Sequence, residues 1–143
     1  MDIRIFYLAP LACIFLLAGC VDDSASYEIG ARDHALSLIR EQRYLWEDEV
    51  ELSLVVTRLP DCQRRHSLEN TMTGDMKIQL YETESQLFLL RHGKNWYSVD
   101  ADACLVELIE PPKQGAQGTL RGTFEQHGAE KFAFVVVEAS QQR

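Results

Sequence analysis

The chain has 143 residues and a formal net charge of −8 at pH 7. This length is enough for one domain with a hydrophobic core and too short for two. Binding to the phosphates of a nucleic acid requires a basic surface, so the acidic balance excludes nucleic acid as an expected partner.

The first predicted element is an apolar segment over residues 5–18. Its last two residues begin the tetrad Leu17-Ala18-Gly19-Cys20. A transmembrane helix needs about 20 consecutive apolar residues. This segment is shorter and contains Pro10. Its short length and the small residues at its end are typical of a cleaved secretory signal. The pattern predicts a signal peptide over residues 1–19. An uncleaved membrane anchor and an ordinary cleaved signal without lipidation are the alternatives.

The tetrad that ends in Cys20 resembles the lipobox of bacterial lipoproteins. The resemblance implies that the Cys20 thiol receives a diacylglyceryl group, that residues 1–19 are removed and that the new amine is acylated. Each buried methylene contributes about 0.8 kcal/mol, so three acyl chains hold a protein on a bilayer permanently. The predicted membrane contact is therefore a lipid anchor at Cys20. In Gram-negative lipoproteins aspartate at the next position usually means retention in the inner membrane, so Val21 favours the outer membrane, facing the periplasm.

After the anchor we expect a short tether over residues 20–28 and a single periplasmic α+β domain over residues 29–143. Apolar residues recur at helical spacing at the start of this domain, and charged residues lie largely between them. The apolar positions are Ala31, Ala35, Leu38 and Ile39. The pattern predicts an amphipathic helix from Ile29 to about Leu45.

Beyond this segment the hydrophobic period changes to two, which is typical of half-buried strands. The predicted strands are residues 50–57, 76–80, 86–91, 95–99, 104–109, 119–125 and 131–138, and residues 65–68 are a weaker candidate. Gly93 and Gly128 separate two pairs of them and predict hairpins. The predicted fold class is α+β: one N-terminal amphipathic helix packed on a curled antiparallel sheet or a small barrel of six to seven strands.

The cysteines predict one disulfide. Cys13 is lost with the signal peptide and Cys20 is consumed by the lipid, which leaves Cys62 and Cys104 in an oxidising periplasm. A metal or redox pair is the rival interpretation, but no Cys-x-x-Cys is present and only His66 follows Cys62 at a ligand spacing. We therefore expect a structural bridge, no metal site and no cofactor.

A candidate binding surface combines the segment Pro60–His66 with Trp96 and Tyr97. If the bridge holds Cys62 against the strand at Cys104, it brings arginines close to aromatic residues. Arginine and aromatic residues are enriched at binding hot spots, and arginine can bind carboxylate or phosphate through two hydrogen bonds. The candidate binding residues are Arg64, Arg65, His66, Trp96 and Tyr97. The alternative is that Trp96 fills the core and that Arg64 or Arg65 caps carbonyl groups.

Two short motifs carry a further resemblance. Cys-Gln-Arg-Arg-His at residues 62–66 and Gly-Lys-Asn-Trp-Tyr at residues 93–97 resemble a group of short uncharacterised proteobacterial lipoproteins. This resemblance implies a location in the cell envelope, but it implies no activity and no cofactor. The small β-barrel lipoproteins that inhibit lysozyme are similar in size, in charge and in cellular location. Their Ser-Gly-x-x-Tyr pattern is absent from this sequence.

These observations predict a non-enzymatic, membrane-anchored envelope lipoprotein that acts as a binding or accessory module for an envelope protein or ligand. An acidic inhibitor or sensor of a cationic enzyme such as lysozyme is the alternative. A small hydrolase with His66 as its base is a third hypothesis, weakened by the lack of a Gly-x-Ser-x-Gly nucleophile motif. We expect no catalytic residues.

Overall fold

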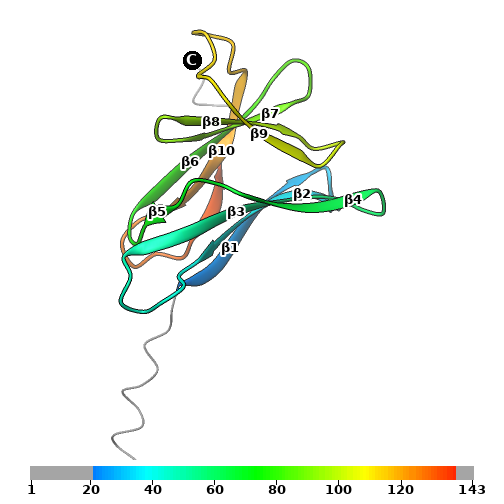
Figure 1. Cartoon of the computed structure of the whole chain (residues 1–143). Coiled ribbons are helices and arrows are strands. Elements are labelled where there is room, and N and C mark those ends of the chain that lie inside the picture. Colours follow the sequence, from blue (N-terminus) through cyan, green and yellow to red (C-terminus); the bar gives the residue numbers. More distant parts are fainter. Residues whose placement is uncertain (1–20, 138–143) are drawn as a thin grey trace, which may run out of the picture.

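The computed structural model describes residues 21–137, and the regular elements in that range are strands (Figure 1). The strands are β1 (Asp22–Ile29), β2 (Ala31–Glu41), β3 (Glu49–Arg58), β4 (Cys62–Ser67), β5 (Thr71–Met72), β6 (Met76–Glu82), β7 (Phe88–His92), β8 (Asn95–Asp100), β9 (Leu105–Ile109), β10 (Thr119–Gln126) and β11 (Ala133–Val136). The strands predicted after residue 50 each coincide with one of these elements, with shifted bounds.

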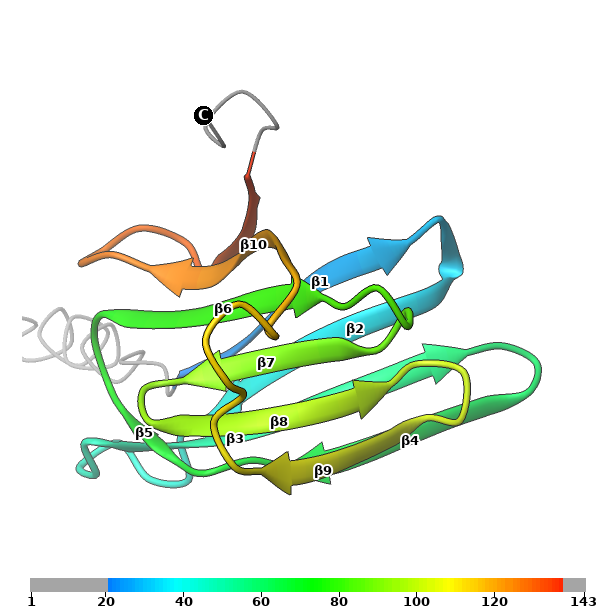
Figure 2. The ribbon, with the colours of Figure 1, turned by 90° about the horizontal axis from the view of Figure 1, so that it is seen from above.

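The predicted α+β class is wrong, because the described chain forms two antiparallel sheets instead of a helix on one curled sheet or a barrel. The first sheet has the order β1-β2-β3-β4, and β5 pairs with the start of β3 beyond the end of β4. The second sheet has the order β11-β10-β6-β7-β8-β9. The two sheets lie on one another as layers, and residues 110–118 cross the outer face of β8 and β7 to connect β9 with β10 (Figure 2).

The predicted helix over residues 29–45 is instead the second strand of a hairpin. Gly30, with a φ of +78°, makes the turn after β1. In β2 the inward positions alternate along the strand. Leu36, Leu38 and Arg40 lie opposite core residues of β3, and His34 lies opposite Arg58. The hydrophobic pattern of the sequence did not show a period of two, because half of these inward positions are polar.

Arg40 can occupy an inward position because its charge is neutralised there. Its side chain is 3 % exposed and donates two hydrogen bonds to the Asp23 carboxylate of β1, at 2.7 and 2.5 Å. Its guanidinium also lies 4.3 Å from the centroid of the Phe132 ring. A buried arginine is stable only with such partners. The hydrophobic pattern of the sequence predicted Arg40 to lie on the surface.

Most of the residues expected to form the tether belong to a strand. From Asp22 to Ile29 the chain is β1, paired with β2 from Asp22 opposite Glu41 onward. Ala25 and Tyr27 of this strand contact the core. The sheet therefore begins two residues after Cys20.

The core lies between the two layers and is almost entirely aliphatic and aromatic. Fully buried side chains from both sheets form it: Leu36, Leu38, Leu52, Leu54, Val56, Ile78, Leu80, Leu90, Val99 and Phe124. Removal of this apolar surface from water is the main stabilising contribution to such a sandwich.

Candidate binding edge

The predicted disulfide is confirmed. Cys62 begins β4, the edge strand of the first sheet, and Cys104 immediately precedes β9, the edge strand of the second sheet. Their Cα atoms are 6.2 Å apart. The bridge therefore joins the two layers at one side of the sandwich.

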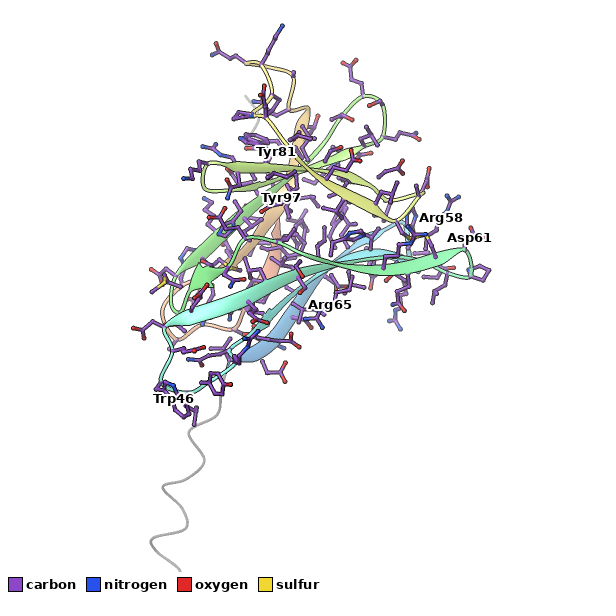
Figure 3. All side chains as sticks on the ribbon, in the orientation of Figure 1. Trp46, Arg58, Asp61, Arg65, Tyr81 and Tyr97 are labelled. Carbon is purple, nitrogen blue, oxygen red and sulfur yellow. A yellow bond between two sulfur atoms is a disulfide. The ribbon has the colours of Figure 1, made fainter. Side chains whose placement is uncertain are left out.

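Two polar contacts strengthen this junction. His66 Nε2 lies 2.9 Å from the carbonyl oxygen of Cys104. Arg58, at the end of β3, forms an ion pair of 2.9 Å with Asp102 in the turn before β9. Figure 3 shows Arg58 with Asp61 at the end of the β3–β4 hairpin. The β3–β4 hairpin is thus fixed to the segment 102–104 by one covalent bond and two polar contacts.

The structure separates the two arginines of the predicted patch. Arg64 lies opposite the fully buried Val56 and is on the side of β4 that faces the second sheet, at the exposed rim. Arg65 is on the outer side, where it forms an ion pair with Glu41 of β2. Arg64 has no ion pair within residues 21–137. Of these two arginines, Arg64 is the one that can contact a ligand at the rim between the two sheets.

The aromatic pair is divided in the same way. Tyr97 points into the core, with 6 % of its surface exposed, and its hydroxyl accepts a hydrogen bond of 3.0 Å from the backbone N–H of Glu69. Trp96 lies on the outer face of the second sheet, where its ring is 5.7 Å from Tyr81 and 5.5 Å from the guanidinium of Arg91. Figure 3 labels Tyr81 and Tyr97 in this layer. Trp96 does not fill the core, and it does not share a face with Arg64 or Arg65.

Sequence reasoning missed the exposed residues of β9. One side of this strand pairs with β8, and no strand of the described chain pairs with the other side. Leu105 and Leu108 are 43 and 68 % exposed, while Val106 packs against the core. The alternating pattern at 104–109 predicted a strand, but no local signal shows that this strand ends a sheet. The free edge of β9, its two leucines and Arg64 at the rim across from it constitute the candidate site, here called the β9 edge.

His66 does not face a nucleophile on its own strand. Its Nε2 is engaged by the Cys104 carbonyl, and Ser67 follows on the opposite side of β4. Residues 21–137 also contain no group of three or more His, Cys, Asp or Glu side chains that could hold a metal ion. The described site offers exposed apolar side chains, a cation and free backbone groups.

Two concave regions lie away from the β9 edge. A cavity of about 210 Å³ is lined by His34, Glu82 and Asp102, among other residues, but both carboxylates have arginine partners, Arg121 and Arg58. A shallow depression of about 160 Å³ is lined by Glu47, Glu49, Glu51, Arg43 and Asn70. Glu49 accepts a hydrogen bond of 2.7 Å from Asn70, and Glu51 is paired with Arg43.

One half-buried histidine has a shifted pKa. Burial lowers the pKa of His92 below its ordinary value of 6.5, and the negative charge of Glu69 partly opposes that shift. Nδ1 of His92 is buried and has no hydrogen-bond partner in the described part of the protein. The neutral form is therefore favoured in the folded state.

Comparison with known protein families, with curated proteins and with solved structures gives no match to this chain. Within residues 21–137, no helix has the length and apolar character that a membrane crossing requires. Cys20, the predicted lipidation site, and residues 1–19, the predicted signal peptide, lie outside the described residues.

Proposed function

We propose that this protein is a non-enzymatic lipoprotein of the bacterial envelope, anchored at Cys20, whose β9 edge binds an extended segment of another envelope protein. The observation that carries the binding proposal is the unpaired edge of β9, with Leu105 and Leu108 exposed on it. An outer-membrane anchor facing the periplasm follows from the lipobox resemblance and from Val21.

A free sheet edge binds a peptide through the backbone groups that it leaves unpaired, and exposed side chains supply specificity. Proteins usually protect such edges with charged residues. The exposed positions of β4 follow that rule with Arg64 and Arg65, whereas β9 carries one exposed charge, Glu107, between two exposed leucines. Leu105 and Leu108 lie on opposite faces of the sheet, so an added strand could contact one leucine on each face.

The disulfide supports this proposal because it holds β9 in place before a ligand arrives. A preformed edge loses less conformational entropy on binding than a mobile one. Arg64 adds a cation at the rim, and a carboxylate on the incoming segment would complement it. The expected ligand is therefore an extended apolar segment with at least one acidic residue.

The test compares two matched variants of the full chain, affinity-purified from bacterial membranes. Leu105→Glu with Leu108→Glu places charges on the β9 edge, and Val135→Glu with Val136→Glu places the same charges on exposed positions of β11, the opposite edge strand of the same sheet. We expect the first variant to lose a partner that wild type and the second variant retain, at equal thermal stability. Identical partner profiles for the three proteins would reject the β9 edge.

A second pair of variants separates the arginines. Arg64→Ala should weaken capture of that partner, while Arg65→Ala, on the outer face of β4, should leave it unchanged. Equal effects of the two substitutions would show that a general loss of positive charge, and not the rim position, is what matters.

An acidic inhibitor or sensor of a cationic enzyme such as lysozyme is the second candidate. The depression around Glu47, Glu49 and Glu51 favours it, because clustered carboxylates attract a basic surface. Binding through that surface would weaken steeply with added salt. Binding at the β9 edge, which depends on apolar contact and backbone hydrogen bonds, would depend only weakly on salt.

A further inference from the structure

The β2–β3 loop exposes three consecutive large apolar residues. Tyr44, Leu45 and Trp46 are 46, 52 and 79 % exposed, and these are the only consecutive three among the exposed large hydrophobic residues of the described chain. The rings of Tyr44 and Trp46 stack at a centroid distance of 5.1 Å and an interplanar angle of 11°. Figure 3 shows Trp46 at the end of the molecule where β1 begins. We call these three residues the aromatic tip.

The aromatic tip is held next to the start of the described chain. The backbone N–H of Val21 donates to Oε1 of Gln42 at 3.1 Å, and the backbone N–H of Gln42 donates to the Val21 carbonyl at 2.8 Å. Nε2 of the same Gln42 side chain donates to the carbonyl of Glu47, on the other side of the aromatic tip. The loop that carries the tip is thus tied to the residue that directly follows Cys20.

We propose that the aromatic tip inserts into the headgroup region of the membrane beside the acyl chains on Cys20; this inference rests on the lipid anchor of the proposed function. Tryptophan and tyrosine concentrate at the interface between lipid and water, because their rings are apolar and their N–H and O–H groups remain hydrated. An acyl anchor fixes where the chain attaches, and a second contact fixes how the domain is oriented. The hydrogen bonds of Gln42 to Val21 place both contacts at the same end of the domain.

The charges around the aromatic tip limit its depth. Glu47 and Asp48 directly follow Trp46, and Arg43, which precedes Tyr44, is paired with Glu51. Carboxylates resist transfer out of water, so only the three apolar residues can enter the headgroup layer. The acidic neighbours also predict weaker contact with an anionic bilayer than with a zwitterionic one, opposite to a polybasic membrane site.

The same orientation leaves the β9 edge accessible. β1 and β2, which flank the Val21–Gln42 contact, belong to the first sheet, whereas β9 is the edge strand of the second. Figure 1 shows β9 in the layer farther from the end where β1 begins. Membrane contact and partner binding would therefore use different surfaces.

The experiment uses the full-length protein, processed in a Gram-negative bacterium and reconstituted in phosphatidylcholine vesicles that contain brominated acyl chains. The chain has two tryptophans, so Trp96→Phe leaves Trp46 as the only reporter. Trp46→Phe leaves Trp96, on the outer face of the second sheet, as the matched control. We expect the brominated lipid to quench most of the Trp46 emission and little of the Trp96 emission.

Two further variants are made in the Trp96→Phe background. Tyr44→Ser with Leu45→Ser should reduce the quenching of Trp46, because it removes the apolar neighbours that hold the ring in the interface. Val135→Ser with Val136→Ser removes two comparably exposed apolar residues of β11 and should leave the quenching unchanged. Replacing phosphatidylcholine with phosphatidylglycerol should lower the quenching at low salt.

The intact mass of the protein shows whether Cys20 is acylated, and it therefore separates failure of the lipid anchor from failure of the membrane contact. If Cys20 carries acyl chains and Trp46 is quenched no more than Trp96, the aromatic tip does not contact the membrane while the anchor stands. An unacylated chain would overturn both proposals. Shielding of Trp46 in whole envelopes but not in pure lipid vesicles would show a protein occupant and would also reject the membrane contact.

Discussion

The two sides of the sandwich are closed by different chemistry. At one side β1 meets β11 through aromatic packing: the ring of Tyr27 lies 5.0 Å from that of Phe134, which in turn lies 4.7 Å from Phe124. At the other side β4 and the segment before β9 are joined by the disulfide and the His66 contact. On the aromatic side the rings of Tyr27 and Phe134 pack against the core, although Val135 and Val136 of β11 remain exposed. On the other side the disulfide joins the two sheets without an aromatic cluster of the described chain between them.

A glycine makes the aromatic side possible. A Cβ at Gly122 of β10 would lie 2.5 Å from Cζ of Phe134 and 2.4 Å from the carbonyl oxygen of Val135. Both distances are well below van der Waals contact, so no larger residue fits without displacing β11. The packing of β10 against β11 is therefore close at Gly122, whereas the disulfide side is held by a covalent bond between the sheets.

The largest expected effect is on the disulfide side. Cys62→Ser with Cys104→Ser removes a bridge with a sequence separation of 42. On the chain-entropy model this lowers the free energy of unfolding by about 4 kcal/mol. Urea denaturation of the double variant against wild type measures the change. A loss below about 1 kcal/mol would show that the polar contacts alone hold this side closed.

On the aromatic side, Phe134→Ala should lower the free energy of unfolding by about 3 kcal/mol, because partly buried ring contacts with Tyr27 and Phe124 are lost. Urea denaturation measures this change as well. Val135→Ala, at an exposed neighbouring position, is the control and should have little effect. If the two substitutions were equally mild, packing of β11 on β1 would not close this side.

At the end of the sandwich near Val21, Asp23→Asn should lower the free energy of unfolding by about 2 kcal/mol, because the buried guanidinium of Arg40 loses its counter-charge. The effect is expected below that of a fully buried pair since the Asp23 side chain is 34 % exposed. Glu41→Gln, which disrupts the exposed pair with Arg65, is the control and should change stability by less than about 1 kcal/mol.

The smallest effect concerns pH. The folded state holds the pKa of His92 below 6.5, so the unfolded chain binds a proton more readily. Stability should therefore be unaffected by this group above about pH 6.5 and should fall as the pH drops from 6.5 through the lower folded pKa. His92→Gln should reduce that slope in thermal denaturation measured between pH 7 and 5, and His127→Gln, at an exposed turn, should not. An unchanged slope in His92→Gln would assign the pH dependence to other groups.

The strands after residue 50 could be predicted because their apolar residues alternate and glycine marks their turns. The region before residue 50 could not. His34 and Arg40 occupy inward positions of β2, so its alternation resembled a helical pattern, and the partner of Arg40 is in β1. Nor does the start of β1 contain a clear apolar alternation, since Asp22, Asp23 and Ser24 open it.

The candidate site was predictable in its covalent part only. Two remaining cysteines in an oxidising compartment were sufficient to predict the Cys62–Cys104 bridge. Arg64 and Arg65 point to opposite faces of β4 because neighbouring side chains alternate along any strand. This rule alone does not identify which of the two arginines binds a ligand. That β9 ends its sheet depends on the chain crossing over β8 and β7 after Ile109, and nothing local to residues 105–109 encodes this.

Amide hydrogen exchange on β9 tests the central claim most directly, because it compares the two edges of one sheet in their native setting. The full-length protein is labelled in isolated envelopes and again after purification in detergent. The outward amides of Leu105–Ile109 should exchange slowly in envelopes and rapidly in the purified protein, while those of Ala133–Val136 should not differ. Equal exchange of the β9 amides in both preparations would contradict a partner strand at this edge.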